Sequence, residues 1–125
     1  MAGRKMVTGW LLDRQDRERL LAQLAPAYPQ VVAHHVTLRF GTDDGTPLPA
    51  AMAGEIVGEG DDGAGVQALV VRIGGTTDRG DDSHFHITWS LAEGRRAKES
   101  NDVIAAYGWR AIAPSLAITL TPARF

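Results

Sequence analysis

The sequence predicts an α+β fold that consists mostly of antiparallel strands, with two main helices on the outside. Two stretches have apolar residues at helical spacing, and six short runs are rich in β-branched and other apolar residues. The middle runs are separated by short connections rich in Gly and Asp, which favour antiparallel pairing. Along the chain, the predicted order is a strand, a helix, several strands, a second helix and a last strand.

The first strand is predicted at residues 7–12, and a helix follows it. Asp13 is placed to be the helix N-cap, and Asp16 lies near the positive end of the helix dipole. The apolar stripe of this helix, which consists of Leu20, Leu21 and Leu24, indicates core positions. Pro26 and Pro29 are expected to end the helix.

The remaining elements are predicted from their composition and their boundaries. Strands are expected at residues 31–40, 55–59, 67–73, 85–91 and 116–120. A second helix is expected over 95–107, with Gly108 as its C-cap and Pro114 before the last strand. The polar connection 74–82 is a candidate mobile rim for a cleft.

Length and composition limit the classes of function. A chain of 125 residues suggests a single domain, 1–125, and a net charge of −2 does not favour tight binding of long nucleic acid. Without cysteine, a thiolate zinc site and a cysteine nucleophile are excluded. The N-terminus resembles neither a secretory signal nor a membrane span, so we expect a cytoplasmic protein without a membrane partner.

A four-residue phrase occurs twice, each time inside a predicted strand. It is His-Val-Thr-Leu at residues 35–38 and His-Ile-Thr-Trp at residues 86–89. Side chains two apart on a strand share a face, so each His projects together with its Thr. If the two strands are neighbours, two imidazoles and two hydroxyls converge on a phosphate-sized site.

This doubled phrase resembles the signature of the 2H phosphoesterase superfamily, which includes 2′-5′ RNA ligase-like proteins and cyclic phosphodiesterases. The resemblance implies a two-lobed fold around a central cleft that both motifs face. It also implies phosphodiester chemistry without a metal or other cofactor, on a 2′,3′-cyclic phosphate or a 2′-5′ linkage of RNA or a nucleotide. The catalytic residues would be His35 and His86, with Thr37 and Thr88 binding the phosphate.

Acid–base chemistry explains why two histidines suit this reaction. Opening a cyclic phosphodiester requires removal of a proton from water and delivery of a proton to the leaving ribose oxygen. Imidazole can do both near neutral pH. One of His35 and His86 would be the base and the other the acid, and the sequence leaves the assignment open. Thr37 and Thr88 would donate hydrogen bonds to the charged oxygens, and Arg39, predicted on the face of His35, would offset charge.

Two alternatives are kept open. The cleft could hold a nucleotide or RNA end without catalysis. His84 shares a predicted face with His86, so these two rings and His35 could instead ligate a catalytic metal ion.

The other candidates are predicted to be structural. Strand alternation places His34 opposite His35, outside the site, and Trp89 in the core. Trp10 and Tyr28 could stack on a base, although packing is the simpler role. Four arginines are expected on a solvated face, namely Arg72, Arg79, Arg95 and Arg96.

Overall fold

The computed structural model describes residues 6–50 and 52–125. Within these residues, the strands form one seven-stranded antiparallel sheet in the order β2-β6-β5-β4-β7-β1-β3. The elements are β1 (Met6–Leu12), α1 (Arg14–Gln23), β2 (Gln30–Val31), β3 (His35–Thr42), β4 (Met52–Asp61), β5 (Val66–Ile73), β6 (His86–Leu91), the 3₁₀ helix η1 (Ala97–Glu99), α2 (Ser100–Tyr107) and β7 (Arg110–Arg124). The predicted α+β class is confirmed. Over the same residues, no helix is long and apolar enough to cross a membrane.

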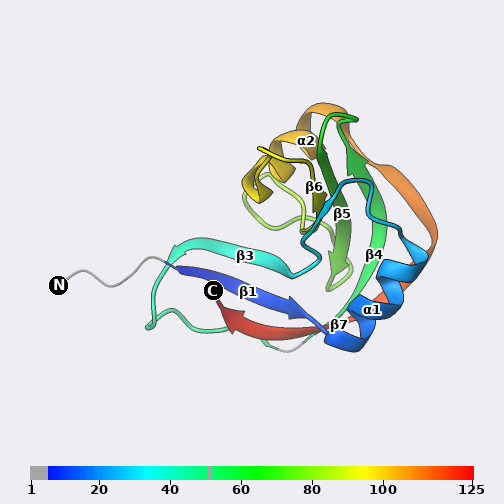
Figure 1. Ribbon diagram of the computed structural model, residues 1–125. Coiled ribbons are helices and arrows are strands. Elements are labelled where there is room, and N and C mark those ends of the chain that lie inside the picture. The colour runs from blue at the N-terminus through cyan, green and yellow to red at the C-terminus, as the bar shows by residue number, and fades with distance from the viewer. Residues whose placement is uncertain (1–5, 51) are drawn as a thin grey trace.

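The sheet is strongly bent, and β7 connects its two parts. β7 pairs with β4 along most of its length and with β1 near its end. Figure 1 shows β1, β3 and the red end of β7 in one part, and β4, β5 and β6 standing across from them in the other. As a result β3, an edge strand, comes into contact with β6, five positions away in the sheet order.

The main hydrophobic core lies between the two parts of the sheet and is covered by α1. Asp13 caps this helix by accepting a hydrogen bond from the backbone N–H of Asp16 at 3.0 Å, as predicted. Leu20 is fully buried, and the indole N–H of Trp89 donates to the carbonyl oxygen of Leu24 at 2.7 Å. Burial of each such side chain contributes about 1.5–3 kcal/mol, so this contact fixes α1 against β6.

One predicted strand, 31–40, is in fact two strands with different partners. β2 pairs with β6, whereas β3 pairs with β1. Between them, Ala33 has φ 45°, a left-handed conformation that ends regular strand geometry, and its side chain is fully buried. Apolar, β-branched composition predicted a continuous strand because it carries no sign of this reversal.

Two further boundaries differ from the prediction. The second helix begins later, as η1 at Ala97, and only α2 from Ser100 is α-helical. The last strand is longer than 116–120 and includes Pro114. Proline fits because the pairing between β4 and β7 shifts register there, so its missing N–H breaks no ladder bond.

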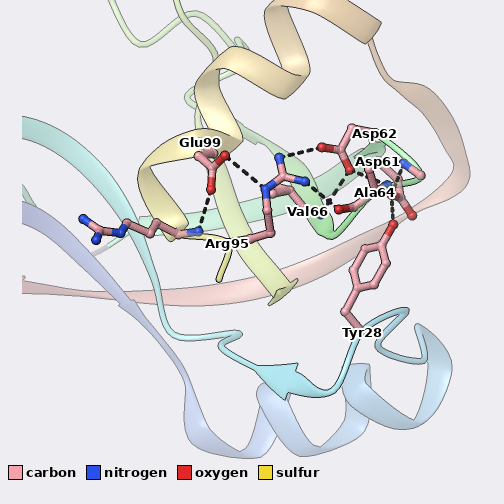
Figure 2. Close-up of polar contacts among 9 residues, drawn as sticks. Tyr28, Asp61, Asp62, Ala64, Val66, Arg95 and Glu99 are labelled. Atoms are coloured by element: carbon pink, nitrogen blue, oxygen red, sulfur yellow. Dashed lines mark hydrogen bonds and ion pairs between the residues drawn. The ribbon is translucent and has the colours of Figure 1, made fainter. Parts of the chain in front are cut away.

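A polar cluster attaches η1 to the turn between β4 and β5 (Figure 2). The guanidinium of Arg95 donates to Asp62 at 2.7 Å and to Glu99 at 3.0 Å. At the end of β4, just before this turn, Asp61 accepts a hydrogen bond of 2.6 Å from the hydroxyl of Tyr28. Arg95 is therefore a structural residue, and the expectation that it lies on a solvated face is wrong. The cluster fixes the start of the helical segment that faces β3.

Candidate active site

The two His-x-Thr motifs line one small pocket of about 100 Å³. β3 and β6 contribute the four predicted side chains, and the helical segment η1–α2 closes the remaining side. The lining residues are His35, Thr37, Phe40, His86, Thr88, Ala97, Lys98 and Asn101. The convergence expected from the sequence is therefore present, although β3 and β6 are not hydrogen-bonded neighbours in the sheet.

The motifs meet because the chain crosses directly from β6 to β1 between β2 and β3. The backbone N–H of Ala33 donates to the carbonyl oxygen of Thr88 at 2.9 Å. One residue later, the carbonyl oxygen of His34 accepts from Leu12 on β1, also at 2.9 Å. His35 follows at once, so the first motif starts two residues after a backbone bond to the second.

The helical side of the pocket supplies a positive charge. Lys98 lies on η1 and Asn101 on the first turn of α2, and no residue that lines the pocket is acidic. The Oδ1 atom of Asn101 is buried without a hydrogen-bond partner among the described residues. An unpaired buried acceptor costs about 1–3 kcal/mol, so this atom leaves the wall of the pocket with one unsatisfied polar group.

A register shift places Phe40, and not Arg39, at the pocket. On β1, Gly9 faces Thr37 and Thr8 faces Arg39, so one extra residue on β3 interrupts the alternation. The prediction that Arg39 shares the face of His35 and Thr37 is therefore wrong, because Arg39 lies outside the residues that line the pocket. Phe40 stands at the rim with its side chain 56% exposed.

His35 is held through its Nδ1 atom. This atom lies 3.0 Å from Nδ1 of His34, and the ring of Phe125 packs against the imidazole with centroids 4.3 Å apart. Burial, together with the neighbouring His34 and His86, lowers the pKa of His35 from 6.5 to about 4. His34 lies outside the residues that line the pocket, as predicted, but its ring contacts that of His35 and does not point away from it, because the left-handed residue before it breaks the alternation of a strand.

His86 is held through Nδ1 as well, but by a different kind of partner. Its Nδ1 lies 3.0 Å from the backbone carbonyl oxygen of His84. Burial lowers the pKa of His86; the bond to this carbonyl opposes that effect, and the nearby charge of Arg79 adds to it. Both motif histidines therefore favour the neutral form more than a histidine in water does.

The two threonines differ in their contacts. The hydroxyl of Thr88 is paired, at 2.8 Å from the hydroxyl of buried Ser100 and 3.3 Å from the carbonyl oxygen of Ala97. The hydroxyl of Thr37 has no hydrogen-bond partner among the described residues. Only the backbone carbonyl oxygen of Thr37 is bonded to a side chain, since it accepts a long hydrogen bond of 3.5 Å from the guanidinium of Arg79. Thr88 thus attaches the helical segment to β6, whereas the hydroxyl of Thr37 is available to a ligand.

Arg79 is buried beside the site, contrary to the expectation of a solvated face. It is 8% exposed, pairs with Asp81 at 3.2 Å, and lies over the ring of Phe40 at 5.1 Å from the centroid. Its long contact with Thr37 joins the connection before β6 to β3. The predicted mobile rim thus carries a buried side chain that packs on the pocket wall.

His84 turns away from the pocket lining. Its Nδ1 lies 2.8 Å from the hydroxyl of Thr77, and its ring packs edge-on against Trp109 at 6.1 Å. Among residues 6–50 and 52–125, no group of three or more His, Cys, Asp or Glu side chains is arranged to hold a metal ion. The two aromatic residues considered for base stacking are engaged elsewhere, since Trp10 is buried and Tyr28 bonds to the turn after β4.

Sequence reasoning missed four residues at or beside the pocket. Lys98 and Asn101 lie in a helix predicted only as a packing element, and spacing along a helix does not reveal which strand it faces. Phe40 required knowledge of the register shift. For Arg79, the only signal in the sequence was its position in the connection just before the second motif.

Comparison with known proteins found no similar protein: no family model, no curated protein and no solved structure matches this chain. A proposal for its function therefore depends on the geometry of the pocket and on the resemblance of its two motifs.

Proposed function

We propose that this protein is a phosphodiesterase of the 2H type, which hydrolyses a 2′,3′-cyclic phosphate or a 2′-5′ phosphodiester of RNA or a nucleotide. In this proposal the two parts of the bent sheet act as two lobes, and the pocket is the centre of the cleft between them. His35 and His86 are the catalytic acid and base, and no metal is required.

The observation that supports the proposal most is the composition of the pocket wall. Two His-x-Thr pairs from distant parts of the chain, together with Lys98, surround a space without a carboxylate. Such surroundings stabilise a phosphate group with one or two negative charges, whereas they do not stabilise a cation. Structural histidines on separate strands would have no reason to share one small pocket.

The pocket volume favours a phosphate over a whole nucleotide. About 100 Å³ is the space of a few water molecules, at roughly 30 Å³ each, and it suits one tetrahedral phosphate. Complete small-molecule sites occupy about 300–1,000 Å³. The nucleoside therefore extends outside, where exposed Phe40 stands at the rim and offers a ring for stacking on a base.

The chemical step needs one histidine on each side of the phosphorus atom. The base removes a proton from water as the water oxygen attacks phosphorus. The bond from phosphorus to the ribose oxygen then breaks, and that oxygen receives a proton from the acid. Meanwhile Thr37 and Lys98 stabilise the charge that builds up on the non-bridging oxygens.

The test is turnover of 2′,3′-cyclic nucleotides and 2′-5′-linked dinucleotides in the presence of a chelator. We expect turnover by the wild-type protein, and a loss of roughly 100- to 10,000-fold in His35→Ala and His86→Ala. Circular dichroism of each variant checks that the fold is kept. Arg39→Ala is the matched control: it removes a cationic side chain of the same strand outside the pocket lining, and we expect turnover within about threefold of wild type.

Each alternative function has its own outcome in this assay. Binding of the substrates without turnover supports a non-catalytic nucleotide or RNA-end module. Loss of turnover with chelator and recovery with zinc or manganese supports a metal hydrolase. Wild-type turnover in either histidine variant removes that residue from the mechanism.

A further inference from the structure

The acid of this reaction must carry a proton at neutral pH, and burial works against this for His35. With a pKa of about 4, roughly one ring in a thousand is charged at pH 7. A neutral imidazole can still give up the hydrogen on one nitrogen if the other nitrogen receives a proton at the same time. The partner of its second nitrogen therefore decides whether His35 can act as an acid.

The partners of the two Nδ1 atoms are chemically different. The carbonyl oxygen of His84 can only accept, so His86 donates its Nδ1 hydrogen to it at 3.0 Å. In neutral His86, Nε2 therefore has a free lone pair. Such a nitrogen can take a proton from water, which is the task of the base.

His35 faces another imidazole, and one ring of this pair must donate to the other. The two Nδ1 atoms are 3.0 Å apart, so a single hydrogen lies between them. His34 is exposed and its charge would be hydrated, whereas the ring of His35 is partly buried under Phe125. The shared hydrogen therefore belongs to His34, and neutral His35 carries its own hydrogen on Nε2.

We propose that His34 is a positioning residue that holds the hydrogen of His35 on Nε2 and supplies the replacement proton, so that His35 is the acid and His86 the base. The inference rests on the proposed function. When the ribose oxygen leaves phosphorus, it takes the Nε2 hydrogen of His35, and Nδ1 of His35 takes the Nδ1 hydrogen of His34, whose exposed ring receives a proton from solvent at Nε2. His86 has meanwhile gained the proton of the attacking water. Nε2 of His35 then takes a proton from solvent, the Nδ1 hydrogen of His35 returns to His34, and His34 and His86 each release a proton, which restores the starting state.

Other charged groups act on these rings from every side of the pocket. His35 faces His86 on β6 and shares the pocket with Lys98 on η1. His86 is also influenced by Arg79 and Asp81, which precede its strand, and by His84. All of these groups remain in a variant of His34 alone, so a change in its pH profile reports on the imidazole that was removed.

The first measurement is the position of the ring hydrogens, by two-bond nitrogen–proton NMR of the imidazoles in the full chain. In wild type at pH 7, we expect His35 to carry hydrogen on Nε2 and His86 on Nδ1. In His34→Asn, the side-chain amide can still donate to Nδ1 of His35, so His35 should keep its hydrogen on Nε2. In His34→Asp, the carboxylate can only accept, so the hydrogen of His35 should move to Nδ1. The matched control is His84→Asn, which keeps the backbone carbonyl and leaves the hydrogen of His86 on Nδ1.

The second measurement is kcat against pH for wild type and His34→Asn. The amide keeps the hydrogen of His35 in place but cannot replace a proton, so we expect kcat to fall at least about tenfold throughout the profile. Wild-type His35 with hydrogen on Nδ1, or an unchanged kcat and profile in His34→Asn, overturns the inference. If wild type turns over none of the phosphodiesters, the proposed function fails, and the NMR result still decides whether His34 is the donor.

Discussion

Replacing each motif threonine by valine tests which hydroxyl serves the proposed reaction and which serves the fold. Valine has the shape of threonine but lacks the hydroxyl, so Thr37→Val and Thr88→Val are matched changes. The hydroxyl of Thr88 is paired with that of fully buried Ser100 at 2.8 Å, whereas that of Thr37 has no partner among the described residues. The two variants should therefore differ in opposite ways: Thr88→Val mainly in stability, and Thr37→Val mainly in turnover.

The magnitudes follow from these contacts. Thr88→Val leaves the buried hydroxyl of Ser100 short of a partner, which lowers the free energy of unfolding by about 1–3 kcal/mol. Thr37→Val removes no such bond, so its free energy of unfolding should stay within about 0.5 kcal/mol of wild type. Turnover by Thr37→Val should fall by about 100- to 1,000-fold, as when a hydrogen-bond donor to a developing oxyanion is lost.

The assays are urea denaturation and turnover of a 2′,3′-cyclic nucleotide under identical conditions. The double variant Thr88→Val with Ser100→Ala removes both partners, so it should be less destabilised than the sum of the single variants. Thr37→Val with lower stability and normal turnover would show that our reading of the two hydroxyls is wrong.

Three further predictions concern charge, backbone and pH. Lys98→Met should weaken competitive inhibition by inorganic phosphate about tenfold or more, because the positive charge at the pocket is lost. Lys98→Arg keeps the charge and should keep the inhibition, so equal inhibition of the two variants would contradict a cationic phosphate site. Ala33→Val should lower the free energy of unfolding by about 2 kcal/mol or more because of the left-handed backbone, and Ala33→Gly should not; the reverse order in urea denaturation would favour a continuous strand. His35 has a pKa of about 4 in the fold and about 6.5 when unfolded, so its contribution to stability is complete above pH 6.5 and is lost as the pH falls towards 4. In His35→Gln, the urea midpoint should therefore decrease less between pH 7.5 and pH 5 than in wild type, and an equal decrease would contradict the burial of this ring.

Local patterns predicted the features of this molecule that depend on neighbours in sequence. The cap at Asp13 and the core stripe around Leu20 follow from short-range helical geometry, and the structure confirms both. The shared face of each His and Thr follows from the alternation of a strand, and the four side chains do line one pocket.

The missed features depend on contacts between distant segments. The reversal at Ala33 is imposed by the change of partner from β6 to β1, and its own side chain does not favour it. The exchange of Arg39 for Phe40 at the pocket depends on how β1 pairs with β3. Arg79 is buried because the connection before β6 folds against β3, which no local pattern encodes.

The path of β7 has a mechanical consequence for the pocket. Among the residues that the structure describes, β7 is the only strand that bonds both to β4 and to β1, so its curvature, together with the crossing at Ala33, sets how far β3 stands from β6. The imidazoles of the two motifs belong to those two strands, and the spacing between them thus depends in part on a strand that carries neither. A slight straightening of β7 would draw the rings apart while every ladder bond survives, so turnover should respond to mild denaturant before spectroscopic signs of unfolding appear.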